Sequence, residues 1–262
     1  MASAAPDHVV LVVEENKDYS QIIGSANAPY INSLASQGTL FTNYHGITHP
    51  SQPNYFALFS GSTQGVTDNN TYFFDAPTLA GELKQAGYTF GGYAEAGSPR
   101  KHNPWQSFAD AQSMGYDFSQ FPKDFTKLPT VSFVSPNQLN DMHDGSVAQG
   151  DQWLSANLGA YATWATTHNS LLIVTFDEDD GTAGNHIPTI AVGEGVTPGQ
   201  NSQWFNHYSL LHTLKDLYGL PGLTSKDKNA ADMSFWTVSP PTPTNPTPTE
   251  ASDPMVSRHR RP

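Results

Sequence analysis

The clearest structural signal is an apolar run, Leu171-Leu172-Ile173-Val174-Thr175-Phe176, that leads directly into Asp177-Glu178-Asp179-Asp180-Gly181. The apolar run has the length and the β-branched content of a buried strand, so the acids are expected at the carboxyl edge of its sheet. Open α/β sheets bind ligands at this edge. Consecutive carboxylates repel one another unless cations neutralise them, and hard metal ions bind such oxygens. The pattern indicates half of a metal site, with a solvated acidic turn as the alternative.

Strands and helices alternate along the rest of the chain. Strands are expected at 8–13, 39–44, 89–93, 131–134 and 187–192, and helices at 28–37, 55–59, 77–86, 152–167 and 207–218. This alternation predicts an α/β fold, with a mostly parallel central sheet and helices on both faces. Long loops are expected over 95–130. We expect a single domain over 1–236 and a disordered Pro/Thr-rich tail over 237–262.

The composition excludes several classes of function. The chain has 24 Asp and Glu against 12 Lys and Arg, and the net charge of -12 opposes binding to nucleic acid. The absence of Cys excludes zinc-thiolate sites, thiol nucleophiles and disulfides. No apolar stretch approaches the ~20 residues of a membrane helix, so no integral membrane segment is expected. The sequence gives no indication of an oligomeric state.

The first residues, Met1-Ala2-Ser3-Ala4-Ala5-Pro6, lack the charged and apolar regions of a signal peptide. Their small side chains are typical of the start of a mature exported protein, and Pro/Thr-rich tails are common on such proteins. We therefore expect a secreted or periplasmic protein, with the signal peptide absent from this sequence.

The first expected strand also ends in acids, because Val13 is followed by Glu14-Glu15-Asn16. Two strand ends in one sheet can together supply the oxygen ligands that a divalent ion requires. Taken alone, Glu15-Asn16 would more simply be the N-cap of a following helix.

A serine between two prolines, Ser51 in Pro50-Ser51-Gln52-Pro53, comes just before an expected helix. The N–H groups of a helix start can bind an anion near such a hydroxyl, and Ser51 is a candidate nucleophile. The alternative is a plain N-cap. The Gly-x-Ser-x-Gly elbow of acyl-transfer enzymes is absent, which argues against an esterase.

Histidines follow other expected strand ends. Lys101-His102 lies in the irregular region, Asp141-Met142-His143 follows the strand that ends near Val134, and His186 lies just beyond the acidic run. Histidine can be a metal ligand or an acid–base group, although a single histidine is more often structural.

Five motifs, taken in order, resemble the bacterial and fungal phosphoesterase family of the alkaline-phosphatase-like superfamily, which includes acid phosphatases and non-specific phospholipases C. The motifs are Glu14-Glu15-Asn16-Lys17-Asp18-Tyr19, His49-Pro50-Ser51-Gln52-Pro53-Asn54-Tyr55, Lys101-His102-Asn103-Pro104, Asp141-Met142-His143-Asp144-Gly145, and Asp177-Glu178-Asp179-Asp180-Gly181 with His186-Ile187-Pro188. The resemblance extends from about His8 to Tyr218 and implies an alkaline-phosphatase-like fold.

The resemblance implies one divalent ion with Ser51 as the nucleophile that touches it. The implied ion ligands are Glu15, Asn16, Ser51, Asp177 and Glu178. The groups implied around the phosphate, where related two-metal enzymes place a second ion, are Lys101, His102, Asp141, His143 and His186. His102, His143 and His186 would be catalytic, and His186 is the expected proton donor to the leaving oxygen. Oxygen ligands favour Ca, Mg or Mn, with Zn possible.

The expected activity is hydrolysis of small phosphomonoesters, as by an acid phosphatase, through a phosphoserine intermediate. The chain is shorter than the phospholipase members, and Asn140 stands where many relatives have His. One alternative is a phospholipase C or other phosphodiesterase, with Tyr72-Phe73-Phe74 and Trp105 as an apolar surface. Another is a sulfatase, although Tyr55 replaces the Arg of that pattern. The last alternative is a non-catalytic Ca-binding module, although the acidic run does not fit EF-hand spacing.

Overall fold

The structure is a computed structural model that describes residues 5–237, so the predicted tail beyond Thr237 lies outside the described residues. Strands of this region form one sheet in the order β4-β3-β5-β1-β6-β7-β2-β8, with β9 paired to β2. The strands are β1 (His8–Glu14), β2 (Thr39–His45), β3 (Phe90–Ala94), β4 (Gly115–Asp117), β5 (Val131–Ser135), β6 (Ser170–Phe176), β7 (His186–Gly193), β8 (Gly199–Asn201) and β9 (Phe205–Asn206). The pairings are parallel except where β7 meets β6 and β2, which confirms the predicted mostly parallel sheet.

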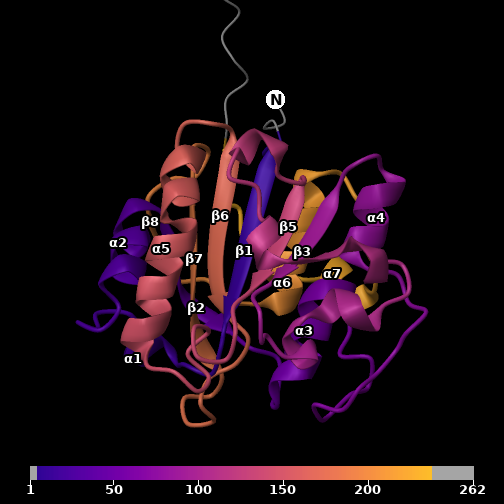
Figure 1. The fold of residues 1–262 in the computed structure, drawn as a ribbon, viewed down its shortest axis with the longest axis horizontal. Helices are drawn as coiled ribbons and strands as arrows, with labels where there is room; N and C mark the ends of the chain where they lie inside the picture. Colours follow the sequence, from indigo (N-terminus) through magenta and orange to yellow (C-terminus); the bar gives the residue numbers. More distant parts are fainter. Residues whose placement is uncertain (1–4, 238–262) are drawn as a thin grey trace, which may run out of the picture.

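Helices flank this sheet in two groups (Figure 1). The α-helices are α1 (Tyr19–Ile22), α2 (Pro29–Gln37), α3 (Ser51–Ser60), α4 (Leu79–Gln85), α5 (Val147–Ala165), α6 (His207–Leu217) and α7 (Ser225–Lys228). In the view of Figure 1, α2 and α5 lie to the left of β1, whereas α3, α4 and α7 lie to its right. Contacts join α2 to α5, both of which also contact β7, and join α3 to α4 and α6.

The centre of the sheet is formed by β1 and β6, whose side chains are almost all buried. Covering both faces of a sheet requires apolar residues at every position of the central strands, which is why these strands are continuous apolar runs. Their parallel register pairs Glu14 with Phe176. The two acidic strand ends therefore lie side by side, as the sequence predicted.

One strand runs against the rest of the described sheet. Because β7 is antiparallel to β6, it begins at the edge of the sheet where β6 ends, and the connection 177–185 is a hairpin loop. An apolar run shows that a strand is buried but not in which direction it points. The sequence therefore predicted this strand but not its direction.

Helix α3 begins at Ser51, several residues before the predicted start at Tyr55. Pro53 falls in its first turn, where a helix needs no N–H from the residue, so proline does not interrupt it. The side chains of α3 are buried along its whole length. This early start places Ser51 at the amino end of a buried helix.

The predicted long loops over 95–130 contain short elements instead. They are β4 and the 3-10 helices η1 (Arg100–His102), η2 (Pro104–Ser107), η3 (Gln112–Met114), η4 (Phe118–Gln120) and η5 (Phe125–Lys127). Trp105 is buried, and a Cβ at Gly92 would lie only 2.2 Å from its ring, so β3 needs glycine there. Trp105 is thus core, while Phe73 is 69% exposed. Within residues 5–237, no helix combines the length and apolar character needed to cross a membrane.

Candidate active site

Three carboxylates from two strand ends meet at the carboxyl edge of the sheet. Glu15 follows β1, while Asp177 and Glu178 follow β6; all three are buried, and their carboxylate oxygens lie within 4.8 Å of one another. The backbone N–H of Asp177 donates to the carbonyl of Glu14 at 3.0 Å. Behind it, the buried ring of His207 at the start of α6 binds the Asp177 carbonyl at 2.6 Å. The predicted convergence of these acids is present.

Asn16 forms hydrogen bonds with two of these carboxylates. Its φ of 49° is in the left-handed region, which Asn adopts more readily than most residues. Its backbone N–H donates to Asp177 at 3.3 Å, and its side-chain amide donates to Glu178 at 3.4 Å. The N-cap of α1 is Asp18, so the capping interpretation of Glu15-Asn16 is wrong.

The Ser51 hydroxyl points at two of the carboxylates. It lies 3.1 Å from Oε2 of Glu15 and 2.9 Å from Oε1 of Glu178. The N-cap of α3 is Pro50, and no side chain caps it, so the capping interpretation of Ser51 is also wrong. The N–H of Gln52 is occupied by Asn69 at 3.1 Å, which reduces the anion site expected at the helix start.

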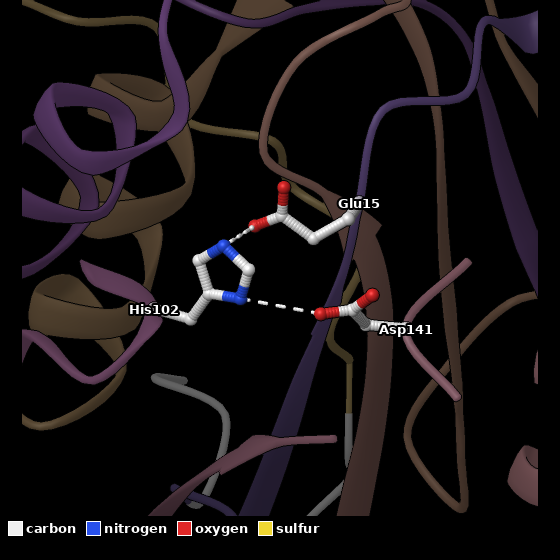
Figure 2. A group of neighbouring side chains, drawn as sticks. All are labelled: Glu15, His102 and Asp141. Carbon is white, nitrogen blue, oxygen red and sulfur yellow. Dashed lines mark ion pairs between the residues drawn. The ribbon is translucent and has the colours of Figure 1, made fainter. Parts of the chain in front are cut away.

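A histidine and a tyrosine contact the second carboxylate oxygen of Glu15, Oε1. Tyr55 lies one helical turn after Ser51, on the same face of α3, and its hydroxyl donates to Glu15 Oε1 at 2.5 Å. Figure 2 shows His102 between two carboxylates, with Nε2 3.0 Å from Glu15 Oε1 and Nδ1 3.2 Å from Asp141 Oδ2. The sequence did not indicate Tyr55, although its spacing of four residues from Ser51 on a helix was an available signal.

The electrostatics of this side favour an ion pair. Burial alone would lower the pKa of His102, but the charge of Glu15 and the hydrogen bond to Asp141 raise it to about 9. Burial would raise the pKa of Glu15, but the charge of His102 and the hydrogen bonds from His102 and Tyr55 lower it to about 2. These interactions favour the charged form of His102.

The carboxyls on the β6 side of the cluster have raised pKa values. Burial, followed by the negative charge of Glu15, raises the pKa of Asp177 well above its usual range. Burial also raises the pKa of Glu178, against the hydrogen bond from Ser51. Asn16 Oδ1 and Asp177 Oδ2 are buried without a hydrogen-bond partner among the described residues. Unpartnered buried oxygens next to like charges fit a bound cation.

His143 and Lys101 border the His102 side of the site. The rings of His143 and His102 lie 6.2 Å apart, and the backbone N–H of His143 donates to Asp141 at 2.8 Å. Both side-chain hydrogen bonds of His143 use Nδ1, with Asp144 at 2.7 Å as the closer partner. The positive charge of Lys101 also lowers the pKa of Glu15. The structure thus brings four of the five predicted phosphate-binding residues together.

The fifth, His186, lies elsewhere. Its Nε2 is 2.9 Å from the Thr42 carbonyl, and its ring stacks on Tyr19 at 4.6 Å and on His45 at 5.1 Å. These contacts, fixed by the pairing of β7 with β2, differ from the phosphate-facing position expected for it. Its role as proton donor stays a prediction.

His49 is a site residue that sequence reasoning missed. Its Nδ1 lies 2.5 Å from Glu178 Oε2, and its Nε2 lies 3.2 Å from Asp179 Oδ1. The available signal was its place two residues before Ser51, because a segment that carries a nucleophile into a site carries its neighbours too.

The remaining polar residues near the site have structural roles. Asp179 accepts hydrogen bonds from the N–H groups of its own loop, while Asp180 is exposed and binds Gln21 at 3.0 Å. The acidic run is therefore half buried carboxylate cluster, Asp177 and Glu178, and half turn. Asn140, which stands where many relatives have His, donates to Glu95 at 2.9 Å.

A family model for the phosphoesterase family matches residues 25–221. The chain belongs to the phosphoesterase family. This phosphoesterase is 50% identical over 239 residues to a phosphatidylinositol-3-phosphatase of Mycobacterium tuberculosis, a match that covers 84% of this chain and 80% of that protein. It is 30% identical to an acid phosphatase of Aspergillus fumigatus over 82% of its own length, and it spans 56% of the length of that fungal protein.

Solved structures show the same fold. A protein of the alkaline phosphatase superfamily from Vibrio parahaemolyticus matches 90% of this phosphoesterase and 72% of its own chain, with a TM-score of 0.66 and 16% identity. The C-terminal periplasmic domain of EcEptC from Escherichia coli, solved in complex with Zn, matches 83% of this chain and 84% of its own, with a TM-score of 0.59 and 12% identity. The predicted family, the fold and an enzyme acting on phosphoric ester bonds are confirmed.

Proposed function

We propose that this phosphoesterase is a metal-dependent phosphatase that hydrolyses phosphomonoesters through a phosphoserine intermediate. The observation that carries the proposal is the position of the Ser51 hydroxyl, 2.9 Å from Glu178 and 3.1 Å from Glu15, within a cluster of buried carboxylates. A hydroxyl that caps no helix and faces two carboxylates is suited to nucleophilic attack.

The residues at the β1 and β6 ends fit one divalent ion. The ligands would be Glu15, Asn16, Ser51, Asp177 and Glu178. The unpartnered oxygens of Asn16 and Asp177 support this set, because a cation would satisfy them. Such an ion lowers the pKa of a bound hydroxyl and polarises the phosphoryl group. The oxygen ligands favour Ca, Mg or Mn, and Zn stays possible.

A histidine supplies the proton that the leaving group needs. As Ser51 Oγ attacks phosphorus, its proton passes to water, because the carboxylate oxygens that face the hydroxyl, Glu15 Oε2 and Glu178 Oε1, would bind the ion. The bond from phosphorus to the ester oxygen breaks, and the leaving oxygen takes a proton from a histidine. His143 is the better placed donor, because its ring lies beside His102. Water then hydrolyses the phosphoserine by the reverse path, in which the neutral His143 takes a proton from the attacking water.

The proposed substrate is a small phosphate ester. The similarity to a phosphatidylinositol-3-phosphatase supports one particular monoester as the substrate, the 3-phosphate of an inositol lipid headgroup. Hydrolysis of that monoester needs the same chemistry as any phosphomonoester. Of the aromatics expected to form an apolar surface for a phosphodiester, Trp105 is buried and Phe73 is exposed, so the phosphodiesterase alternative keeps only part of its support. A secreted or periplasmic location remains a prediction.

Three measurements test the proposal. Elemental analysis of the purified protein, with activity after chelation and after return of single metals, should show a divalent ion that is needed for turnover. Initial rates should be high on p-nitrophenyl phosphate and phosphatidylinositol 3-phosphate, and low on bis(p-nitrophenyl) phosphate and phosphatidylcholine. Mass spectrometry of acid-quenched enzyme should find phosphate on Ser51. Full activity after complete chelation would contradict the metal, and preference for the diesters would favour the phosphodiesterase alternative.

A further inference from the structure

The two glutamates around Ser51 are held in matching ways. Each has one oxygen facing the hydroxyl, Oε2 of Glu15 and Oε1 of Glu178. The other oxygen of each contacts a histidine, His102 at 3.0 Å from Glu15 Oε1 and His49 at 2.5 Å from Glu178 Oε2. A free carboxylate rotates about its last bond, whereas one bound on its far oxygen has a fixed direction.

His49 is itself anchored to a rigid loop. Its second ring nitrogen lies 3.2 Å from Asp179 Oδ1. Asp179 accepts the N–H groups of Gly181 at 2.7 Å and of Ala183 and Asn185 at 2.8 Å each, so its carboxylate organises the whole turn. His49 thus connects Glu178 to Asp179, the carboxylate that accepts three backbone N–H groups of this loop.

The backbone before His49 is fixed as well. Asn54, on α3, accepts hydrogen bonds from the N–H groups of Ile47 at 2.8 Å and Thr48 at 3.1 Å. The Asn185 amide donates to the Thr48 carbonyl at 3.1 Å. The segment that carries His49 is therefore attached both to the helix of Ser51 and to the loop that follows β6.

We propose that His49 is a positioning residue, which holds Glu178 in the direction needed to bind a divalent ion beside Ser51. This inference rests on the proposed metal-dependent function. His49 is not a ligand, because Nδ1 is directed at the far oxygen of Glu178 and Nε2 at Asp179. Loss of a group that orients a metal ligand typically costs about 10- to 100-fold in metal affinity or activity.

Three variants separate the two contacts of His49. His49→Asn places an amide nitrogen near the position of Nδ1 and so retains the contact with Glu178, while His49→Gln reaches only the position of Nε2 and Asp179. His49→Ala removes both. The side chain of His49 is 44% exposed, so all three variants are expected to fold. His212→Ala is the matched control, because it breaks another histidine–aspartate pair, to Asp216 at 3.3 Å on α6.

The experiment titrates the metal-free, full-length proteins with MnCl2 and with CaCl2 by calorimetry. His49→Ala and His49→Gln should bind at least about 10-fold more weakly than wild type, while His49→Asn and His212→Ala bind within about twofold. The turnover lost by His49→Ala should return as the metal concentration rises, which a general structural defect would not show.

The possible outcomes distinguish the two proposals. Wild-type protein that binds no divalent ion would overturn both the metal site and the role of His49. Wild-type binding with unchanged affinity in His49→Ala would overturn the role of His49 alone. Weak binding by His49→Asn together with full binding by His49→Gln would also overturn it, because the contact with Asp179 rather than Glu178 would then be the important one.

Discussion

Replacement of Asp177 by Asn should stabilise the metal-free protein and at the same time remove its response to metal. Asp177 is buried beside Glu15 and Glu178, and burial raises its pKa well above the usual range. The substitution removes one negative charge with almost no change in shape. A metal ligand is lost by the same change, so the two effects on thermal stability have opposite signs.

The size of the first effect follows from the spacing of the carboxylates. Their oxygens lie within 4.8 Å of one another, which at an effective dielectric constant of ~20 corresponds to about 3.5 kcal/mol of repulsion for each ionised pair. In a protein of this size, 1 kcal/mol changes the melting temperature by about 2–4 °C. The gain from Asp177→Asn is therefore at most about 7–14 °C for each ionised neighbour, because protonation of Asp177 relieves part of the repulsion.

The effect of pH has a definite sign. The pKa of Asp177 is higher in the folded protein than in the unfolded chain, so metal-free wild type loses stability as the pH rises from the unfolded pKa toward the folded one. Asp177→Asn lacks this loss. The difference in melting temperature between the two proteins should accordingly grow from mildly acidic to neutral pH.

Differential scanning fluorimetry measures both effects. In EDTA at neutral pH, Asp177→Asn should melt about 5 °C or more above wild type. A metal at 100 times its Kd should stabilise wild type by about 2.7 kcal/mol and raise its melting temperature by about 5–11 °C, with little change in Asp177→Asn. Asp180→Asn is the control, because Asp180 is exposed and should show neither effect. Lower stability of Asp177→Asn in EDTA, or an undiminished response to metal, would refute the reasoning.

Four further substitutions test other parts of the structure. Ser51→Ala should lower turnover by about 10³-fold or more while circular dichroism stays unchanged; near wild-type turnover would point to direct attack by water. His143→Ala should lower turnover on alkyl phosphates more than on p-nitrophenyl phosphate, whose leaving oxygen needs little protonation, and His186→Ala should show a smaller contrast; the reverse ranking would make His186 the donor. Lys215→Met leaves the Asp227 carboxylate buried without the ammonium that lies 2.6 Å away, and urea unfolding should show a loss of about 3–5 kcal/mol.

The sequence was sufficient to predict the centre of the site. Uninterrupted apolar runs identified two buried strands, and parallel strands in one sheet necessarily end at the same edge. Acids that directly follow such strands must therefore approach one another. That reasoning needed no knowledge of loops, which is why the predicted meeting of Glu15 with Asp177 and Glu178 agrees with the structure.

Predictions that depended on strand direction or on long-range side-chain contacts were less successful. The direction of β7 decides where His186 points, and no periodicity records direction. His49 meets Glu178 across more than a hundred residues of chain, through a segment with no regular structure. Tyr55 was part of a family motif, but the sequence did not indicate a contact with Glu15, because the partner of its hydroxyl depends on the tertiary fold.

The hairpin between β6 and β7 also bears on how new specificity can be acquired. A parallel successor to β6 would have required a crossover helix, which carries the chain away to the opposite edge of the sheet. The antiparallel direction of β7 instead keeps residues 177–185 at the carboxyl edge of the sheet, where the buried carboxylates meet. Asp180 and Gly184 are exposed at the tip of this loop, where added segments are best tolerated. A segment inserted between them would lie in the loop that follows Asp177 and Glu178, and it would break no strand pairing.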